Sequence, residues 1–354
     1  MKTNTIYAAV ALLALITFGS CERTESPLPE IKPSDGNKLT LNGGIGGLDA
    51  ANAVYVDLST DKQDSVKRKD WSLGFYCAAD FRVILNYQVG MSAIETSQTD
   101  IKAVNSSNVD LSKLDYDTKP EKIKLYDDTA GRVNQSVITE VNATENQNKV
   151  YIVNPLFASV KKDELWKVKV TRSGTNAYNL QYAPIDATNI QTLTITKDNT
   201  FNFKHVSFSK GAVNVEPKKD DWDFVWTKAS FYTMMGPNTP VPYAFSDLIF
   251  LNHETGVSAA EVVFLDKEGK TNGKPSYDEF DASKLSAINL KTGRNVIGSK
   301  WRNTLGTGAL KDRFYVIKDK AGNIYKLKFI AMGAGKDGGK RGYPEIEYKL
   351  VKGK

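Results

Sequence analysis

Short runs in which polar residues alternate with β-branched or aromatic residues follow one another from residue 38 onward. Examples are residues 54–58, 81–85, 165–170, 314–317 and 325–329. Successive side chains of a strand point to opposite faces, so this alternation predicts half-buried β-strands, and Gly, Asn, Asp and Pro mark turns between them. Helical periodicity is scarce, and residues 110–114 and 278–290 predict short helices. The chain is predicted to be all-β, with antiparallel sheets.

Five blocks of this pattern occur twice in the same order. The clearest is DWSLGF at 70–75, which returns 151 residues later as DWDFVW at 221–226. The other pairs are 55–59 with 205–209, 150–153 with 314–317, 166–170 with 325–329, and 179–182 with 345–348. Generic strands resemble one another, but the shared order and the repeated Trp after an acidic residue favour a duplication. We therefore predict two tandem β domains, residues 38–196 and 197–354.

The N-terminal segment predicts export. Lys2 precedes an apolar stretch at 6–18, which is too short to cross a hydrocarbon core of about 30 Å. Small residues come before Cys21, as in the lipobox of bacterial lipoproteins, so residues 1–20 are predicted to be a lipoprotein signal peptide with lipidation at Cys21. The alternative is a plain secretory signal that ends beside a Cys. Residues 21–37, rich in Pro and charge, predict a flexible tether.

The composition excludes several classes of function. The 354 residues include 47 Lys and Arg against 41 Asp and Glu, a surplus too small to favour nucleic acid or an anionic membrane surface. Two His and two Cys exclude a His-rich metal centre, a Cys cluster and a disulfide scaffold. No later stretch is long and apolar enough to span a membrane, so membrane contact is predicted only through the lipid on Cys21. Cys77 is predicted to be buried.

Catalytic motifs are not found. Residues 333–342 look like a phosphate loop, but Ala334 and Arg341 stand where such a loop needs Gly and Ser or Thr. The chain has no nucleophile elbow, His-Glu zinc motif or calcium loop. We therefore predict that the protein is not an enzyme.

The blocks of the second half also carry a family resemblance. They are VSFSKG at 206–211, residues 214–215, DWD at 221–223, and residues 313–329, with fainter counterparts at 57–60 and 70–71. These blocks resemble the HmuY-like family of haem-binding outer-membrane lipoproteins. The resemblance implies two HmuY-like β domains on a lipoprotein that is anchored in the outer membrane at the cell surface. It also implies non-covalent binding of haem or a related porphyrin, which is passed to a TonB-dependent outer-membrane receptor.

In this family His or Met side chains are the axial ligands of the haem iron, and they lie between the Trp-Asp block and the last hairpin. That window, about 236–311, contains one His, His253, and Met234 and Met235 stand at its entrance. These three residues are the predicted axial candidates, and no other metal site is predicted. The alternatives are an exposed loop His and Met side chains that fill the core.

Other residues receive weaker or structural interpretations. His205 is predicted to be structural, and Met91 is the corresponding candidate in the first half. Tyr243 and Tyr277 could offer a phenolate ligand. The three aromatic residues Trp222, Phe224 and Trp226 are predicted to share one buried face of a strand.

The residues leave a second function open. A pair of His or Met ligands cannot be placed from the sequence. The alternative is a lipoprotein with the HmuY fold that has lost haem ligation and binds another small molecule, a glycan or a protein partner.

Overall fold

The computed structural model describes residues 32–115, 117 and 119–354. The predicted signal peptide, the lipidation site Cys21 and residues 21–31 of the predicted tether lie outside these described residues. The last residues of the predicted tether begin a strand, because β1 (Gly36–Thr40) pairs with β21 (Glu345–Lys352). Among the described residues, no helix is both long and apolar enough to span a bilayer.

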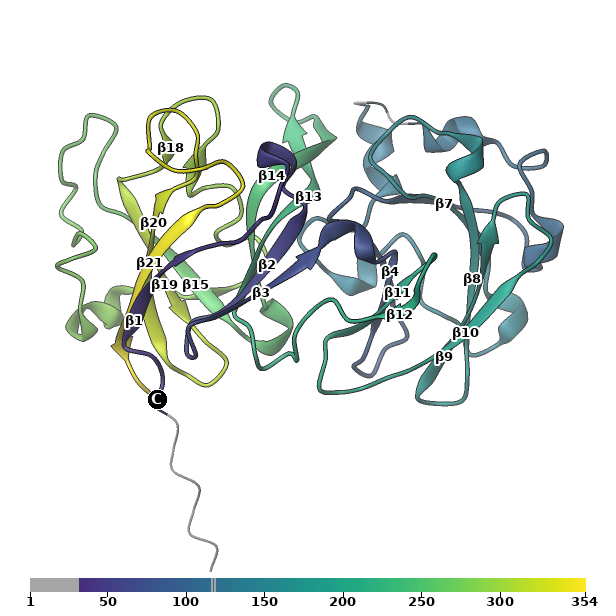
Figure 1. Cartoon of the computed structure of the whole chain (residues 1–354), viewed down its shortest axis with the longest axis horizontal. Helices are drawn as coiled ribbons and strands as arrows, with labels where there is room; N and C mark the ends of the chain where they lie inside the picture. The colour runs from purple at the N-terminus through teal and green to yellow at the C-terminus, as the bar shows by residue number, and fades with distance from the viewer. Residues whose placement is uncertain (1–31, 116, 118) are drawn as a thin grey trace, which may run out of the picture. The chain divides into compact units, whose positions relative to one another are not determined.

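The predicted all-β fold is confirmed (Figure 1). The described chain forms antiparallel sheets joined by turns and short 3₁₀ helices (η). The sheets fall into two sets, which we call module I and module II. Each set has one four-stranded sheet and one larger sheet.

Module I is built from residues 73–213. Its five-stranded sheet has the order β10 (Gln191–Thr196), β9 (Ala177–Pro184), β8 (Trp166–Arg172), β7 (Val150–Asn154), β6 (Ser92–Glu95). Its four-stranded sheet has the order β12 (Gly211–Val213), β11 (Phe203–Ser207), β4 (Leu73–Tyr76), β5 (Val83–Leu85). Apolar residues of both sheets form one buried cluster, with Phe75 and Val206 on the smaller sheet and Val168 and Leu180 on the larger. Burial of this cluster drives the packing of the module.

Module II takes strands from both ends of the chain. Its six-stranded sheet has the order β1, β21, β20 (Ile324–Ala331), β19 (Arg313–Lys318), β15 (Ser258–Val263), β16 (Lys291–Thr292). Its four-stranded sheet has the order β14 (Pro240–Leu251), β13 (Phe224–Met234), β2 (Asn52–Asp57), β3 (Lys62–Lys67), and β17 (Arg302–Asn303) pairs with β18 (Gly308–Ala309). Val54, Phe224 and Trp226 meet Tyr315 and Leu327 in its core.

The two modules are nested rather than consecutive. β4 of the first half pairs with β11 of the second, and β2 pairs with β13. Module I is therefore inserted between β3 and β13 of module II. The prediction of tandem domains divided between residues 196 and 197 is not confirmed, because strands from both sides of that point share sheets.

The repeated blocks nevertheless occupy matching positions. β7, β8 and β9 are adjacent in module I, as β19, β20 and β21 are in module II. The ring of Tyr55 meets Trp222 edge-on with centroids 5.0 Å apart, and His205 meets Trp71 in the same way at 4.8 Å. In each module, therefore, the strand of the first block comes from one copy of the repeat and the Trp that it packs against comes from the other copy.

The predicted short helices are confirmed at η4 (Leu111–Leu114) and η10 (Ala282–Ala287). Asp110 and Asp281 cap them, because each carboxylate accepts the backbone N–H two residues ahead. The other 3₁₀ helices are η1 (Gly47–Asp49), η2 (Arg68–Asp70), η3 (Ile101–Ala103), η5 (Pro120–Leu125), η6 (Val133–Gln135), η7 (Glu145–Gln147), η8 (Lys162–Glu164) and η9 (His253–Thr255). Cys77 is buried with a free thiol, as predicted.

One prediction about the aromatic residues of the second half is wrong. Phe224 and Trp226 lie in the core of module II, but Trp222 precedes β13 and packs in another cluster with Tyr55 and Phe250. The alternation of faces begins only where the strand begins, so it does not extend back to Trp222. The prediction that these three side chains are buried is confirmed.

Candidate functional site

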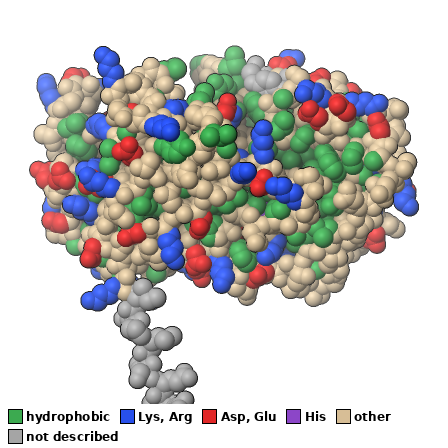
Figure 2. All heavy atoms as spheres, in the orientation of Figure 1, with side chains coloured by type: hydrophobic (Ala, Val, Ile, Leu, Met, Phe, Trp, Pro, Cys, Tyr) green, Lys and Arg blue, Asp and Glu red, His purple; other side chains and the backbone are tan. Residues whose placement is uncertain are grey.

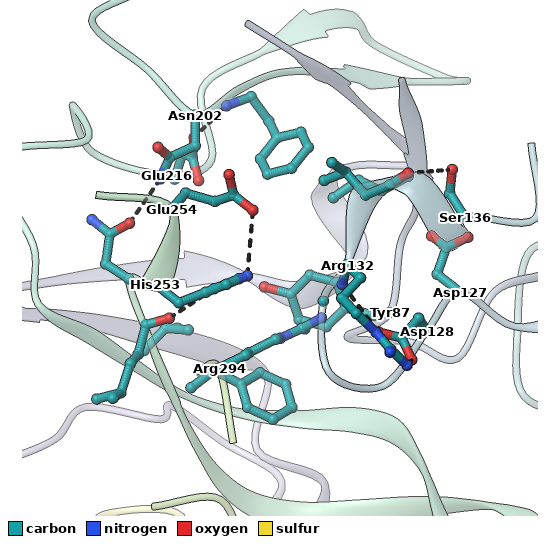
Figure 3. Close-up of a pocket in the computed structure, with 18 of the residues that line it drawn as sticks. Tyr87, Asp127, Asp128, Arg132, Ser136, Asn202, Glu216, His253, Glu254 and Arg294 are labelled. Carbon is teal, nitrogen blue, oxygen red and sulfur yellow. Dashed lines mark hydrogen bonds and ion pairs between the residues drawn. The ribbon is translucent and has the colours of Figure 1, made fainter. Parts of the chain in front are cut away.

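A pocket lined by charged and aromatic side chains lies where the four-stranded sheets of the two modules meet, and we call it the interface pocket (Figure 3). Module I contributes Tyr87 and His205, and module II contributes Trp222, His253 and Arg294. Its volume is about 70 Å³. Both His residues of the chain therefore line one cavity.

The predicted ligand His253 begins η9 in this pocket, and its two ring nitrogens face protein oxygens. Its Nε2 atom lies 3.3 Å from Oε1 of Glu254, and its Nδ1 atom lies 3.4 Å from the carbonyl oxygen of Leu251. The backbone of Gly131 covers the ring, since a Cβ atom there would lie 3.0 Å from Cε1 of His253. In this arrangement His253 presents no free nitrogen to an iron atom.

Glu254 continues this chain of polar contacts. Its Oε2 atom accepts a hydrogen bond of 2.7 Å from the hydroxyl of Tyr76. Burial raises the pKa of Glu254, but the hydrogen bonds with His253 and Tyr76 outweigh burial, so the net shift is downward. Glu254 is therefore ionised at neutral pH.

Two other acidic side chains of the pocket have raised pKa values. Burial raises the pKa of Glu216 to about 8, although the hydrogen bond of 2.6 Å from the backbone N–H of Phe203 acts in the opposite direction. Burial also raises the pKa of Asp127 to about 6, although its hydrogen bonds from the backbone N–H groups of Val137 and Leu85 lower it. At pH 7 Glu216 is mainly protonated and Asp127 mainly ionised.

Arg294 crosses the pocket between two aromatic rings. Its guanidinium carbon lies 4.0 Å from the ring centroids of both Tyr87 and Phe250. Its buried Nη2 atom has no hydrogen-bond partner in the described part of the chain. The neighbouring Arg132 differs, because it pairs with Asp128 at 2.8 Å.

The interface pocket does not fit haem. A volume of about 70 Å³ accommodates only a few water-sized groups. The walls also carry Glu254, Asp127 and Arg294, whereas a macrocycle needs an apolar slot. No haem chemistry is therefore assigned to this pocket.

The structure separates the predicted methionines from His253. Met234 ends β13 and Met235 follows it at the tip of the β13–β14 hairpin, with 47% and 57% of their surfaces exposed (Figure 1). His253 follows the other end of this hairpin, so about 35 Å of strand separates them at about 3.3 Å per residue. His253 and these methionines cannot bind one iron atom together.

A larger hollow, which we call the groove, lies beside the same hairpin. Its volume is about 600 Å³, and Val89, Leu156 and Ala229 are among its apolar lining residues. Cationic side chains also line it, namely Lys67, Arg68, Lys69 and Lys228. Lys228 forms an ion pair with Asp49 of the groove. The groove thus combines an apolar wall with positive charge.

Arg68 is the buried cation of the groove. It is 4% exposed, it stacks on Trp226 with the guanidinium carbon 5.2 Å from the ring centroid, and its Nε atom has no partner among the described residues. Burial lowers its pKa to about 10, while Asp247 and Asp49 act in the opposite direction. Arg68 therefore remains charged at neutral pH with unused hydrogen-bonding capacity.

The groove continues onto the hairpin that carries Met234. Ser230 and Ala244 are opposite each other in the β13–β14 ladder, and both line the groove. Tyr232 and Met234 follow Ser230 at intervals of two residues, so they lie on the same face. Sequence reasoning missed Tyr232 and Arg68, although the run of three cations at 67–69 between two strands was a signal for the latter.

The remaining candidates are distributed through the fold. His205, which was predicted to be structural, is buried with its ring against Trp71, and Met91 lies in the core of module I. Tyr243 is exposed on the β13–β14 hairpin, and Tyr277 is buried in a cluster with Phe314. The face shown in Figure 2 carries basic and acidic side chains intermixed, in keeping with the small net charge.

Comparisons with known proteins agree with the predicted resemblance and extend it to the first half. The model of the HmuY family, described as HmuY protein, matches residues 49–348 as one stretch across both modules. A comparison with curated proteins finds no match. A solved structure titled as apo PinO from Porphyromonas gingivitis is 12% identical, and the alignment covers 90% of this chain and 98% of that chain with a TM-score of 0.25. Because the family match covers most of its length, this chain belongs to the HmuY family, and this membership suggests haem binding or a related role at the cell surface.

Proposed function

We propose that this protein binds haem or a related porphyrin in the groove and passes it to a TonB-dependent outer-membrane receptor. It would act without catalysis, as a lipoprotein anchored through Cys21 in the outer membrane at the cell surface. The observation that carries the proposal is the buried cation Arg68 in the wall of a groove of about 600 Å³ that also has apolar lining residues. Membership of the HmuY family supports it.

The groove is complementary to an amphipathic ring. Haem is a flat apolar macrocycle with two carboxylates at one edge, and pockets of about 300–1,000 Å³ hold ligands of comparable size. Val89 and Leu156 would contact the ring, and Arg68 would receive a carboxylate. Lys67 and Lys69 are exposed at the groove, where they would attract the second carboxylate.

Met234 is the axial ligand in this proposal. It lies on the face that lines the groove, about 13 Å beyond Ser230 at about 3.3 Å per residue. A thioether is an established type of haem ligand, and the Met side chain has three rotatable bonds that let it turn toward the groove. The adjacent Met235 lies just beyond the end of β13 and outside the alternation that carries Met234, so it is not a ligand in this proposal.

Haemin titration of the full-length protein in detergent tests the proposal, with detergent alone as the blank. We expect a Soret shift that saturates at about one haem per chain. Met234→Ala should remove the shift and Met235→Ala, its matched control, should retain it. Arg68→Gln should weaken binding about tenfold, since hydrogen bonds to charged groups contribute about 1.5–3 kcal/mol.

A titration with no saturable shift would refute haem binding. The second function would then be favoured, in which the fold binds another small molecule, a glycan or a protein partner. The separation of His253 from Met234 and Met235 is the observation that supports this alternative. A shift that persists in Met234→Ala, together with unchanged affinity in Arg68→Gln, would instead place the haem outside the groove.

A further inference from the structure

We propose that the edge strand β10 of module I pairs with β10 of a second copy of this chain, so that the five-stranded sheets of two copies join into one sheet. This surface lies outside the groove, and the argument for it does not rest on haem binding. It rests on the free side of β10, on the sequence of that strand, and on the fit of this sequence to itself.

The backbone of β10 has one free side. Lys197 donates its N–H to the carbonyl oxygen of Asn176 at 2.9 Å, in the same register in which β10 pairs with β9. In an antiparallel ladder every second residue turns both of its backbone groups toward the partner strand. The N–H and C=O groups of Thr192, Thr194 and Thr196 therefore face away from β9, and no strand of the described chain pairs with that side.

The sequence of this edge differs from that of the other edges of the described sheets. β10 reads QTLTIT, six residues without a charge or a Pro, and its ladder with β9 has no bulge. By contrast, β1 contains Lys38, β3 contains Lys62 and β14 begins with Pro240. The remaining edge strands, β5, β6, β12, β16, β17 and β18, have at most four residues. Charges, Pro and short length protect sheet edges against other chains, so β10 is the edge that is left open to pairing.

A copy of the same strand fits this edge. A two-fold axis beside Thr194 places the two Thr194 residues opposite each other and brings Thr192 opposite Thr196 of the second copy. Leu193 then meets Ile195 of the second copy on the face that packs against the core of module I. Thr pairs with Thr and an apolar residue with an apolar residue, and both kinds of cross-strand pair are stabilising. The outward backbone groups of the two strands would form about six hydrogen bonds.

The absence of charge favours a second copy over an unlike partner. A two-fold axis brings identical residues together, so a charged edge would repel its own copy, whereas it could attract a partner of opposite charge. Thr192, Thr194 and Thr196 are exposed and carry no charge, so nothing on this edge repels a copy. Because the edge also holds no titratable group, pairing should change little with salt or pH.

The expected dimer is reversible. A ladder of this length buries less than the about 1,200 Å² of a standard stable interface, so we expect a dissociation constant in the micromolar range. No residue of β10 lines the groove, so each copy keeps its own groove free.

Sedimentation equilibrium of the full-length protein in a density-matched detergent tests this pairing. We expect a monomer–dimer equilibrium that is nearly the same at low and high salt. Thr194→Lys places two like charges opposite each other at the axis and should weaken the dimer about fivefold. Thr292→Lys is the matched control, because it adds the same charge to the exposed edge strand β16 and should leave the dissociation constant unchanged.

A mixture of two variants separates lost pairing from lost folding. Thr194→Glu alone should dimerise as weakly as Thr194→Lys, and an equimolar mixture should recover the dimer, because Lys then faces Glu across the axis. Mixing would not repair a misfolded chain. A wild-type protein that stays monomeric at every concentration, equal effects of Thr194→Lys and Thr292→Lys, or a mixture that stays as weakly paired as its components would each overturn the proposal. The measurements are made without haem, so the result stands apart from the haemin titration.

Discussion

The carboxyl group of Asp223 accepts a hydrogen bond of 2.8 Å from the backbone N–H of Leu58, which is 165 residues earlier in the chain. Ser72 makes the matching contact in the other module, where its hydroxyl accepts the N–H of Phe208 at 3.1 Å. In each module, this hydrogen bond joins the residue after the repeated Trp to the residue that follows a strand from the other copy of the repeat. Burial, and then the nearby Asp57, raises the pKa of Asp223 well above its usual value, against the hydrogen bond from Leu58.

Replacing Asp223 tests this contact. Asp223→Ala leaves the N–H of Leu58 buried without an acceptor, and we expect a loss of about 2 kcal/mol in the free energy of unfolding. Asp223→Asn keeps a neutral acceptor and should lose less than half as much. Urea unfolding followed by fluorescence measures both. Equal losses for the two variants would show that the hydrogen bond to Leu58 does not account for the loss in Asp223→Ala.

Haem with esterified carboxylates tests the role of Arg68. The wild-type protein should bind the dimethyl ester about tenfold more weakly than haem, because the ester cannot form a charged pair with the guanidinium. In Arg68→Gln the two ligands should bind with similar affinity. The comparison forms a double-mutant cycle, and an unchanged preference for the free acid in the variant would show that another cation holds the carboxylate.

Glu216 should make the protein less stable as pH rises. Its pKa is about 8 in the folded state against an ordinary value of 4.5, so the folded state holds the proton more tightly. The stabilisation is complete below about pH 4.5 and is lost as the pH rises through 8. Glu216→Gln stays neutral at every pH and should remove this decline. Thermal unfolding from pH 5 to pH 9 checks it, and parallel curves for the two proteins would contradict it.

His205 should make the protein less stable as the pH falls. Burial, with a smaller contribution from Lys204, lowers its pKa to about 3, from an ordinary value of 6.5. The unfolded chain then binds a proton that the folded chain does not, so stability falls as the pH drops below about 6.5. His205→Phe keeps an edge-on ring against Trp71 and should reduce the loss between pH 6.5 and pH 4. Unfolding midpoints in urea at each pH provide the measurement. If the midpoint of the variant falls as much as that of the wild type between pH 6.5 and pH 4, the prediction is wrong.

Expression of fragments distinguishes nested modules from tandem ones. Residues 68–216 contain both sheets of module I and should unfold cooperatively on heating. Residues 38–196 lack β11 and β12 and leave β2 and β3 without β13, so this fragment should show no cooperative transition. Circular dichroism of the two fragments provides the measurement. The reverse result would restore the boundary between residues 196 and 197.

Local patterns predicted the strands, the two short helices and the duplicated blocks, because each depends on side chains close in sequence. They could not predict strand partners. The segments that contain Trp71 and Trp222 share the Asp-Trp pair, and contacts with distant residues decide whether 55–59 or 205–209 pairs beside each of them. His205 was predicted to be structural, and its packing against Trp71 agrees with that. Arg294 had no local signal, since its role depends on Tyr87 and Phe250 from other parts of the chain.

The insertion of module I has a consequence for how the chain acquires its structure during synthesis. All strands of module I lie between residues 73 and 213, so this part can close while later residues are still being added. β2 can pair with β3 at once, but β1 and the other edge of β2 must wait, because their partners β21 and β13 come much later in the chain. Pairings of such large sequence separation form slowly. β1 and β2 are therefore synthesised before module I but pair with β21 and β13 after it. During that interval the apolar residues of β2 are exposed and can pair with the wrong segments.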